Sequence, residues 1–137
     1  MSIPNVARNS DGSVYENREA VALTLTASKV ASVSSSDIPT YGYHGVMVCT
    51  NLTFPVGSAP SIVISVEAKD GIAGTYTALL SSAAITTTVS SWLTVYPGIT
   101  AVANQKASQG LPKNIRITYT NAADSAVTAT IGYNLLK

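Results

Sequence analysis

Few residues in this chain could activate a nucleophile for covalent catalysis. Nucleophilic catalysis needs a base that activates the nucleophile and a third group that orients the base. The chain has one histidine, His44, and one cysteine, Cys49. Residues five apart on an extended strand point to opposite faces, so these two do not form a dyad. We expect His44 to lie in a loop or at a strand edge, and Cys49 to be a small buried or interfacial thiol.

Carboxylates, which serve both acid–base catalysis and metal binding, are scarce. The chain has seven acidic residues, and three of them lie before residue 20. In the remainder Glu67 and Asp70 form the one close pair, and Lys69 between them indicates a solvated hairpin rather than the paired acids of a glycoside hydrolase. No loop carries the several acids of a calcium site, and the ligands of a zinc site are lacking. We therefore predict no catalytic residue, no metal, no cofactor and no enzymatic activity.

The low charge of the chain limits its possible partners. Asp, Glu, Lys and Arg make up 11% of the residues, whereas about 25% is typical of globular domains. The net charge of +1 lacks the basic excess that attracts phosphates, so we expect no nucleic-acid partner. A neutral surface rich in Ser, Thr and Ala gives little protection against association, and we expect other proteins or copies of the chain to cover much of it. A monomer kept in solution by hydroxyl groups alone is the alternative.

The place of synthesis follows from what the sequence does not contain. A single cysteine cannot form an internal disulfide, so nothing requires an oxidising compartment. The first residues lack an apolar run behind a basic flank, and no stretch approaches the roughly 18 apolar residues of a membrane span. We expect synthesis in the cytoplasm and no membrane partner.

Alternation of apolar and polar residues, which is typical of half-buried strands, recurs along the chain, and helical spacing hardly occurs. The ranges with this pattern are 20–28, with Val21, Leu23, Leu25 and Ala27 facing inward, then 45–54, 61–68, 76–81, 86–96, 114–121 and 126–135. Asp70-Gly71 and Pro97-Gly98 mark turns, and residues 99–113 read as a long loop. Seven or eight short strands predict an all-β domain, a two-sheet antiparallel sandwich of jelly-roll or immunoglobulin-like type.

The first 19 residues differ from the rest because they show no alternation and hold five charged residues. We interpret residues 1–19 as an N-terminal arm outside the sandwich of residues 20–137. We expect the arm to be flexible in the free protein and ordered on a partner. Its apolar anchors are Ile3, Pro4 and Val6, and Arg8 and Arg18 could form ion pairs at the rim of the contact. A tail without a role is the alternative.

Four aromatic residues could act together: Tyr41, Tyr43, Trp92 and Tyr96. They could form a platform for a sugar, and Trp92 and Tyr96 share strand parity, so they would lie on one face. Packing in the core or in a contact between subunits is the more ordinary use of such rings. We therefore count Trp92 and Tyr96 among the candidate partner-binding residues.

Several turns and strand ends together resemble a known group of proteins. These are Lys69-Asp70 at a hairpin, Tyr96-Pro97-Gly98 at a turn, Leu111-Pro112 and the strand from Arg116 to Tyr119. Across residues 44–135 the chain resembles the small β-sandwich decoration, or cement, proteins of tailed-bacteriophage heads. The resemblance implies a structural protein, often a homotrimer, that sits on the outside of the virion capsid and bridges neighbouring capsomers. Its partner would then be the major capsid protein.

Two other placements stay open. A structural role in the phage neck or tail would make another virion protein the partner. A carbohydrate-binding sandwich on a virion or fibre would use the aromatic residues instead.

Overall fold

The structure is a computed structural model of the 137-residue chain, and it describes residues 18–88, 90–123 and 125–137. Most of the expected arm, including Ile3, Pro4, Val6 and Arg8, lies outside the described residues. Arg18 and Glu19 are described, and they belong to the first strand.

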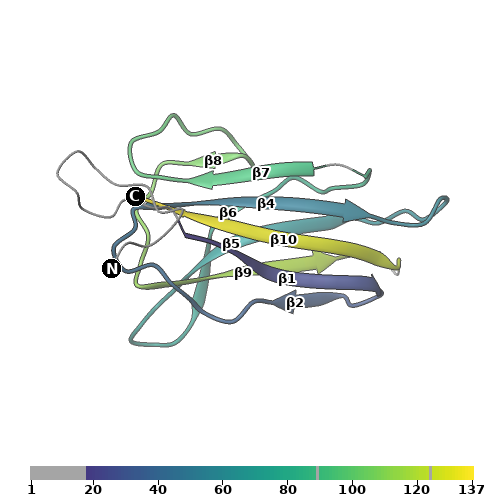
Figure 1. The fold of residues 1–137 in the computed structure, drawn as a ribbon, viewed down its shortest axis with the longest axis horizontal. Coiled ribbons are helices and arrows are strands. Elements are labelled where there is room, and N and C mark those ends of the chain that lie inside the picture. Colours follow the sequence, from purple (N-terminus) through teal and green to yellow (C-terminus); the bar gives the residue numbers. More distant parts are fainter. Residues whose placement is uncertain (1–17, 89, 124) are drawn as a thin grey trace, which may run out of the picture.

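The described residues form strands and no helix, as the alternating pattern predicts. The strands are β1 (Arg18–Ser28), β2 (Ser32–Ser34), β3 (Ile38–Pro39), β4 (Gly45–Thr53), β5 (Ile62–Lys69), β6 (Tyr76–Ser81), β7 (Ser90–Val95), β8 (Lys106–Ala107), β9 (Asn114–Asn121) and β10 (Val127–Leu136). They run side by side along the long axis of the molecule (Figure 1).

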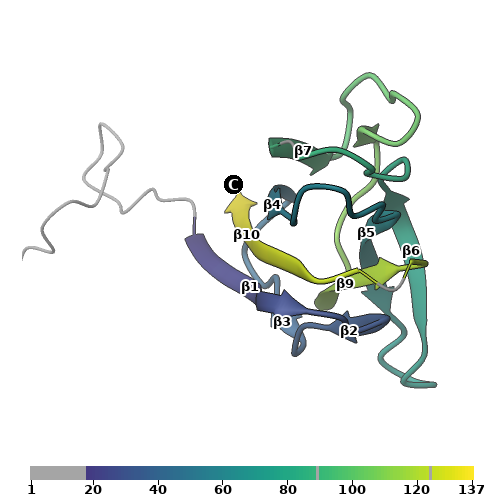
Figure 2. The same cartoon turned by 90° about the vertical axis from the view of Figure 1, so that its right-hand side faces the viewer.

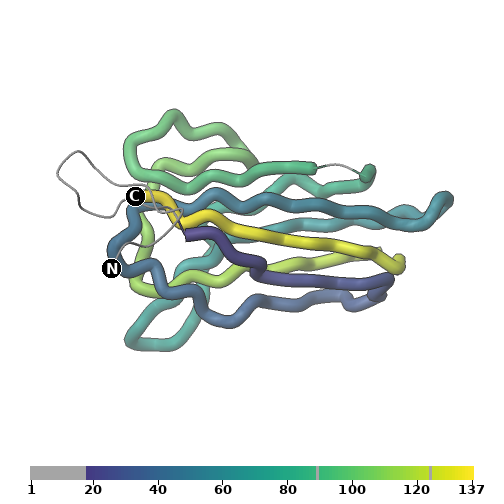
Figure 3. Tube along the Cα trace, in the orientation of Figure 1, coloured from purple at the N-terminus to yellow at the C-terminus, as the bar shows by residue number. Residues whose placement is uncertain are grey.

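The strands form two sheets with a distinctive order. The first sheet has the order β1-β10-β4-β7-β8 and the second β2-β9-β5-β6, with β3 paired to β9. If the two-residue strands β3 and β8 are left aside, the outermost pair along the chain is β1 with β10, and the next pair is β2 with β9. The same nesting continues inward with β4–β7 and β5–β6. These nested pairs are those of one long hairpin. The hairpin is rolled up, so that β10 also pairs with β4 and β9 also pairs with β5. This is the jelly roll, which can be followed along the tube in Figure 3.

The core lies between the two sheets, which face each other in Figure 2. Side chains alternate between the faces of a strand, so each sheet sends every second residue inward. The fully buried large side chains are mostly Ile and Val, from β4, β5, β7, β9 and β10, together with Tyr119 and Leu135. The alternation therefore gives the correct inner face for β4, β5, β9 and β10, and the all-β sandwich is confirmed.

The first strand departs from its expected pattern. Leu23 is buried, but Val21 is 60% exposed, whereas the alternation places both inside. The pairing of β1 with β10 shifts register between Val21 and Leu23 and again between Leu25 and Ser28. A shift of one residue turns the following side chains to the other face. The prediction for Val21 is therefore wrong, because a strand with an irregular register does not keep one parity along its length.

The region after β6 also differs from the expectation. The expected strand over 86–96 is shorter, since β7 begins at Ser90. The expected loop over 99–113 contains β8, which pairs with β7 in parallel. Two further short strands, β2 and β3, were not predicted, because two or three residues are too few to show a period.

One glycine marks a place where two strands fit too closely for a side chain. A Cβ atom added to Gly45 would lie 2.3 Å from Cδ2 of Tyr96 and 2.5 Å from the carbonyl oxygen of Val95. Gly45 therefore leaves room for the Tyr96 ring, which lies over it.

We predict that Gly45→Ala destabilises the protein by about 1–3 kcal/mol, because either the ring or the β7 backbone must move. Gly110→Ala is the matched control, since its added Cβ would meet nothing within 4 Å, and we expect it to change stability by less than about 0.5 kcal/mol. Urea denaturation followed by circular dichroism measures both. Equal effects in the two variants would contradict the crowding at Gly45.

Candidate protein-binding site

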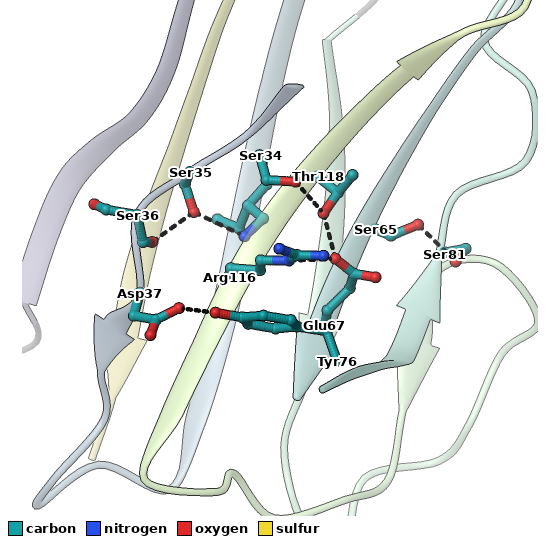
Figure 4. Close-up of polar contacts among 11 residues, drawn as sticks. Ser34, Ser35, Ser36, Asp37, Ser65, Glu67, Tyr76, Ser81, Arg116 and Thr118 are labelled. Carbon is teal, nitrogen blue, oxygen red and sulfur yellow. Dashed lines mark hydrogen bonds and ion pairs between the residues drawn. The ribbon is translucent and has the colours of Figure 1, made fainter. Parts of the chain in front are cut away.

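The outer face of the second sheet carries a hydrogen-bonded charge network that joins β5, β6 and β9 (Figure 4). The guanidinium Nε of Arg116 donates to Oε1 of Glu67 at 2.7 Å, and the hydroxyl of Thr118 donates to the same oxygen. The Arg116 guanidinium also lies 3.5 Å from the centre of the Tyr76 ring. Arg116 thus has an anion and an aromatic face as partners at the same time.

The same network reaches the segment that connects β2 and β3. The Tyr76 hydroxyl donates to Oδ1 of Asp37 at 2.5 Å, and Nζ of Lys69 donates to Oδ2 of Asp37 at 2.6 Å. Each oxygen of this carboxylate therefore accepts a bond from a different strand. Lys69 lies at the β5–β6 hairpin, and its side chain, which is still 30% exposed, pairs with Asp37.

These contacts shift the acid–base equilibria of the network. The hydrogen bond from Lys69 and then that from Tyr76 lower the pKa of Asp37 below its usual range. Burial raises the pKa of Glu67, but the bonds from Thr118 and Arg116 outweigh burial and leave that pKa lowered. Bonding to Asp37 in turn raises the pKa of Lys69. The charged forms are thus the stable forms here, and the network ties the strands of the second sheet together.

We predict that the protein loses stability in acid through this network. The folded pKa values of Asp37 and Glu67 lie below the unfolded values of about 4. The stabilisation is therefore complete above pH about 4 and is lost as the pH falls through the folded values. The double variant Asp37→Asn, Glu67→Gln should melt lower than wild type at pH 7, and its melting temperature should fall less steeply toward pH 3. Glu19→Gln, on the other sheet, is the control. A double variant as acid-sensitive as wild type would contradict the assignment.

The outer face of the first sheet is different, because it holds an apolar depression. Cys49 on β4 pairs with Gly132 on β10 and with Trp92 on β7, and Gly132 pairs with Val21 on β1. These four residues form one row across the sheet, in which Gly132 adds no side chain to the middle. Met47, one row away, completes the apolar part.

We call this depression the trough. Its volume is about 380 Å³, and its lining residues are Glu19, Ala20, Val21, Met47, Cys49, Trp92, Gly132, Tyr133 and Asn134. Trp92 is 56% exposed and Val21 60% exposed. On one side the trough is bordered by a row of hydroxyl and amide side chains, formed by Thr24, Thr130, Asn51 and Ser90.

The candidates for chemistry lie apart. Cys49 is half-buried in the trough, and burial raises the pKa of its thiol, so the thiol is less nucleophilic than a free cysteine. His44 is exposed just before β4, where its backbone N–H donates to the carbonyl of Leu136. Among the described residues, no group of three or more His, Cys, Asp or Glu is placed to hold a metal ion. No helix in this part of the chain has the length and hydropathy of a membrane span.

The four aromatic residues do not form one platform. Tyr96 lies on the same outer face as Trp92, as its parity predicts, but four residues along a strand separate the two by about 13 Å. The Tyr96 hydroxyl donates to the carbonyl of Lys137 at 2.9 Å, and Nζ of Lys137 lies 5.0 Å from the centre of the Tyr43 ring. These two tyrosines therefore gather around the last residue, at the end of the sandwich. Tyr41 is 92% exposed.

Most of the residues that line the trough were not predicted from the sequence. Trp92 was predicted as a partner-binding residue and Cys49 as a small buried or interfacial thiol, but Met47 was not predicted. A signal was present, because two apolar residues alternate on the face that should be polar. This alternation does not show that Met47 and Cys49 lie near Trp92 and Val21, because the register of β4 against β7 and β10 cannot be read from the sequence.

No family model matches the sequence, and no curated protein matches it. The similar solved structures include two of infectious bursal disease virus. One is the structure of its Gx strain, with 12% identity and a TM-score of 0.35, over 97% of this chain and 38% of that chain. The other is the T13 viral particle, with 14% identity and a TM-score of 0.34, over 98% of this chain and 36% of that chain. The chain spans less than two-fifths of either one. A likeness at this level assigns neither a family nor a function.

We predict that Trp92 contributes little to folding. Leu93, its neighbour on the core side, is 2% exposed, and Leu93→Ala should destabilise the protein by about 2–5 kcal/mol. Trp92→Ala should cost less than about 1 kcal/mol, because its ring stays largely in water in the folded chain. Denaturant unfolding of the two variants gives both values. A cost for Trp92 as large as that for Leu93 would mean that the ring belongs to the core.

Proposed function

We propose that this protein is a structural, non-enzymatic component of a virion, and that it binds the outside of a phage head as a decoration protein. One observation carries the protein-binding part of the proposal: the trough exposes Trp92 and Val21 on the outer face of the first sheet. The resemblance of residues 44–135 to head decoration proteins supports the place of binding.

Exposed aromatic and aliphatic residues grouped at a depression are typical of binding surfaces. Tryptophan is among the residues that contribute most to protein interfaces, because one ring buries a large area with few rotatable bonds. An apolar depression bordered by hydroxyl and amide groups matches the common anatomy of an interface, with an apolar centre and a polar rim. We propose the trough as the centre of such a contact.

The other parts of the chain have subordinate roles in this proposal. The charge network of the second sheet satisfies its own groups, which leaves them little to offer a partner. The arm supplies further contacts through Ile3, Pro4 and Val6, with Arg8 and Arg18 at the rim. A homotrimer would present three troughs to the capsid. Each contact can then be modest, since linked contacts multiply their effect.

A sugar-binding module is the competing function. Jelly rolls occur in lectins as well as in capsid proteins, so the fold does not choose between the two. An exposed indole in the same depression as an amide and a carboxylate, as with Trp92, Asn134 and Glu19, can also stack on a sugar ring. A glycan array tests this function directly, and strong binding of one sugar class would favour it over the capsid role.

The amount of this protein in purified virions, relative to the major capsid protein, decides between a head and a neck or tail. We predict a copy number comparable to that of the capsomers, and a sharp fall in occupancy for Trp92→Ala. Thr120→Ala, at an exposed position on the outer face of the second sheet, is the control and should bind normally. A few copies per virion would place the protein in the neck or tail. Full occupancy by the Trp92 variant would exclude the trough from the contact.

A further inference from the structure

The walls of the trough suit a long aliphatic stem. Neighbouring strands lie about 4.8 Å apart, so Val21 and Trp92, three strand spacings from each other, have Cα atoms roughly 14 Å apart. Between them Gly132 and Cys49 leave a low floor, and Met47 lies beside it. An extended apolar chain of a few methylene groups can lie across this floor and cover the exposed parts of the two walls.

One end of the trough is polar and acidic. Glu19 pairs with Asn134 across β1 and β10, and Asn134 pairs with Met47. The amide oxygen Oδ1 of Asn134 is buried and has no hydrogen-bond partner among the described residues. Glu19 is exposed, and no ion pair of its carboxylate is found in the described part of the chain. The lining includes no lysine or arginine. Two acceptors thus lie close together, and none of the described residues supplies a cation to them.

The second sheet shows what such a set of groups holds. There an aromatic ring, Tyr76, and a carboxylate, Glu67, hold the guanidinium of Arg116. The trough also has a ring, Trp92, and a carboxylate, Glu19, but these lie on β7 and β1, so the occupant must reach across the floor to contact both. Charge complementarity therefore favours a cationic side chain as the occupant.

We propose that the trough binds an arginine side chain presented by the partner protein. The stem lies across Gly132 and Cys49 against Trp92, and the guanidinium reaches Glu19 and, after rotation of its amide, Asn134. Arginine fits better than lysine because its planar group has several donors and can serve both acceptors together. A leucine or phenylalanine anchor would fill the apolar part but leave the Asn134 oxygen unpaired, which is costly when the trough closes. The inference rests on the proposed function for the identity of the partner, but not for the chemistry of the trough.

The chain reports on this site by itself, because Trp92 is its one tryptophan. The probes are three capped tripeptides of alanine with arginine, citrulline or leucine at the centre, titrated into the full chain while tryptophan emission is recorded. We expect a saturable change with the arginine peptide that weakens as salt is added. Citrulline, a neutral isostere, should bind roughly tenfold more weakly, since it lacks the charged hydrogen bonds. The leucine peptide should bind more weakly than the arginine peptide.

Two variants locate the effect. Glu19→Gln should weaken arginine binding roughly tenfold. Thr120→Lys changes the net charge by the same amount on the outer face of the second sheet, where Thr120 is exposed, and should leave binding nearly unchanged. Circular dichroism confirms that both fold. The proposal is overturned if the leucine peptide binds as well as arginine, if Glu19→Gln binds normally, or if the folded protein gives no saturable response to arginine.

A third variant distinguishes the partner from the chain itself. If Arg8→Gln alone changes the Trp92 emission and opens the trough to the arginine peptide, the occupant is the N-terminal segment of this protein and the proposal is wrong. The titration needs no virion, so its outcome is separate from that of the proposed function. Failure with normal head occupancy would refute the arginine site alone, and success with no head occupancy would refute the head placement alone.

Discussion

Contact between the inner faces of the two sheets determines where nearly every other side chain lies. The buried Ile, Val and Leu residues of β4, β5, β7, β9 and β10 exclude water from the space between the sheets, and this burial is the main stabilising term in a domain of this size. Because strand side chains alternate, burial of one set forces the other set outward. Arg116 faces out because Ile115 and Ile117 face in, and Trp92 faces out because Leu93 faces in.

The outward-facing side chains of the two sheets differ in whether they have partners within the molecule. On the second sheet the polar groups find partners within the molecule, so Asp37, Glu67, Lys69 and Arg116 form a closed arrangement around Tyr76. On the first sheet the side chains of Trp92 and Val21 are exposed to water, and the amide oxygen of Asn134 has no hydrogen-bond partner among the described residues. A surface with satisfied groups loses as much as it gains when a partner covers it, whereas unsatisfied groups gain. This difference between the two faces is the physical basis for the proposal that the first sheet binds the partner.

Sequence periodicity could predict the strands whose alternation is unbroken. The inner faces of β5 and β9 follow from it, since residues such as Ile64 and Tyr119 repeat with period two. It failed at Val21, where an irregular register in β1 reverses the parity, and at β2, β3 and β8, which are too short to show a period. The trough could not be predicted for another reason. Its residues come from β1, β4, β7 and β10, and only the long-range pairing of these strands brings Cys49 between Gly132 and Trp92.

The nesting of the strands also affects how the chain folds. β5 and β6 are joined by a short loop and can pair soon after collapse, but Arg18 meets Leu135, near the other end of the chain. Pairing over such sequence distances loses much loop entropy before contacts compensate for it, so folding of this topology is slow relative to helical domains of the same length. Until β1 joins β10, the edge of β10 is open and hydrophobic. Newly made chains are therefore most prone to aggregate in the interval before β1 pairs with β10.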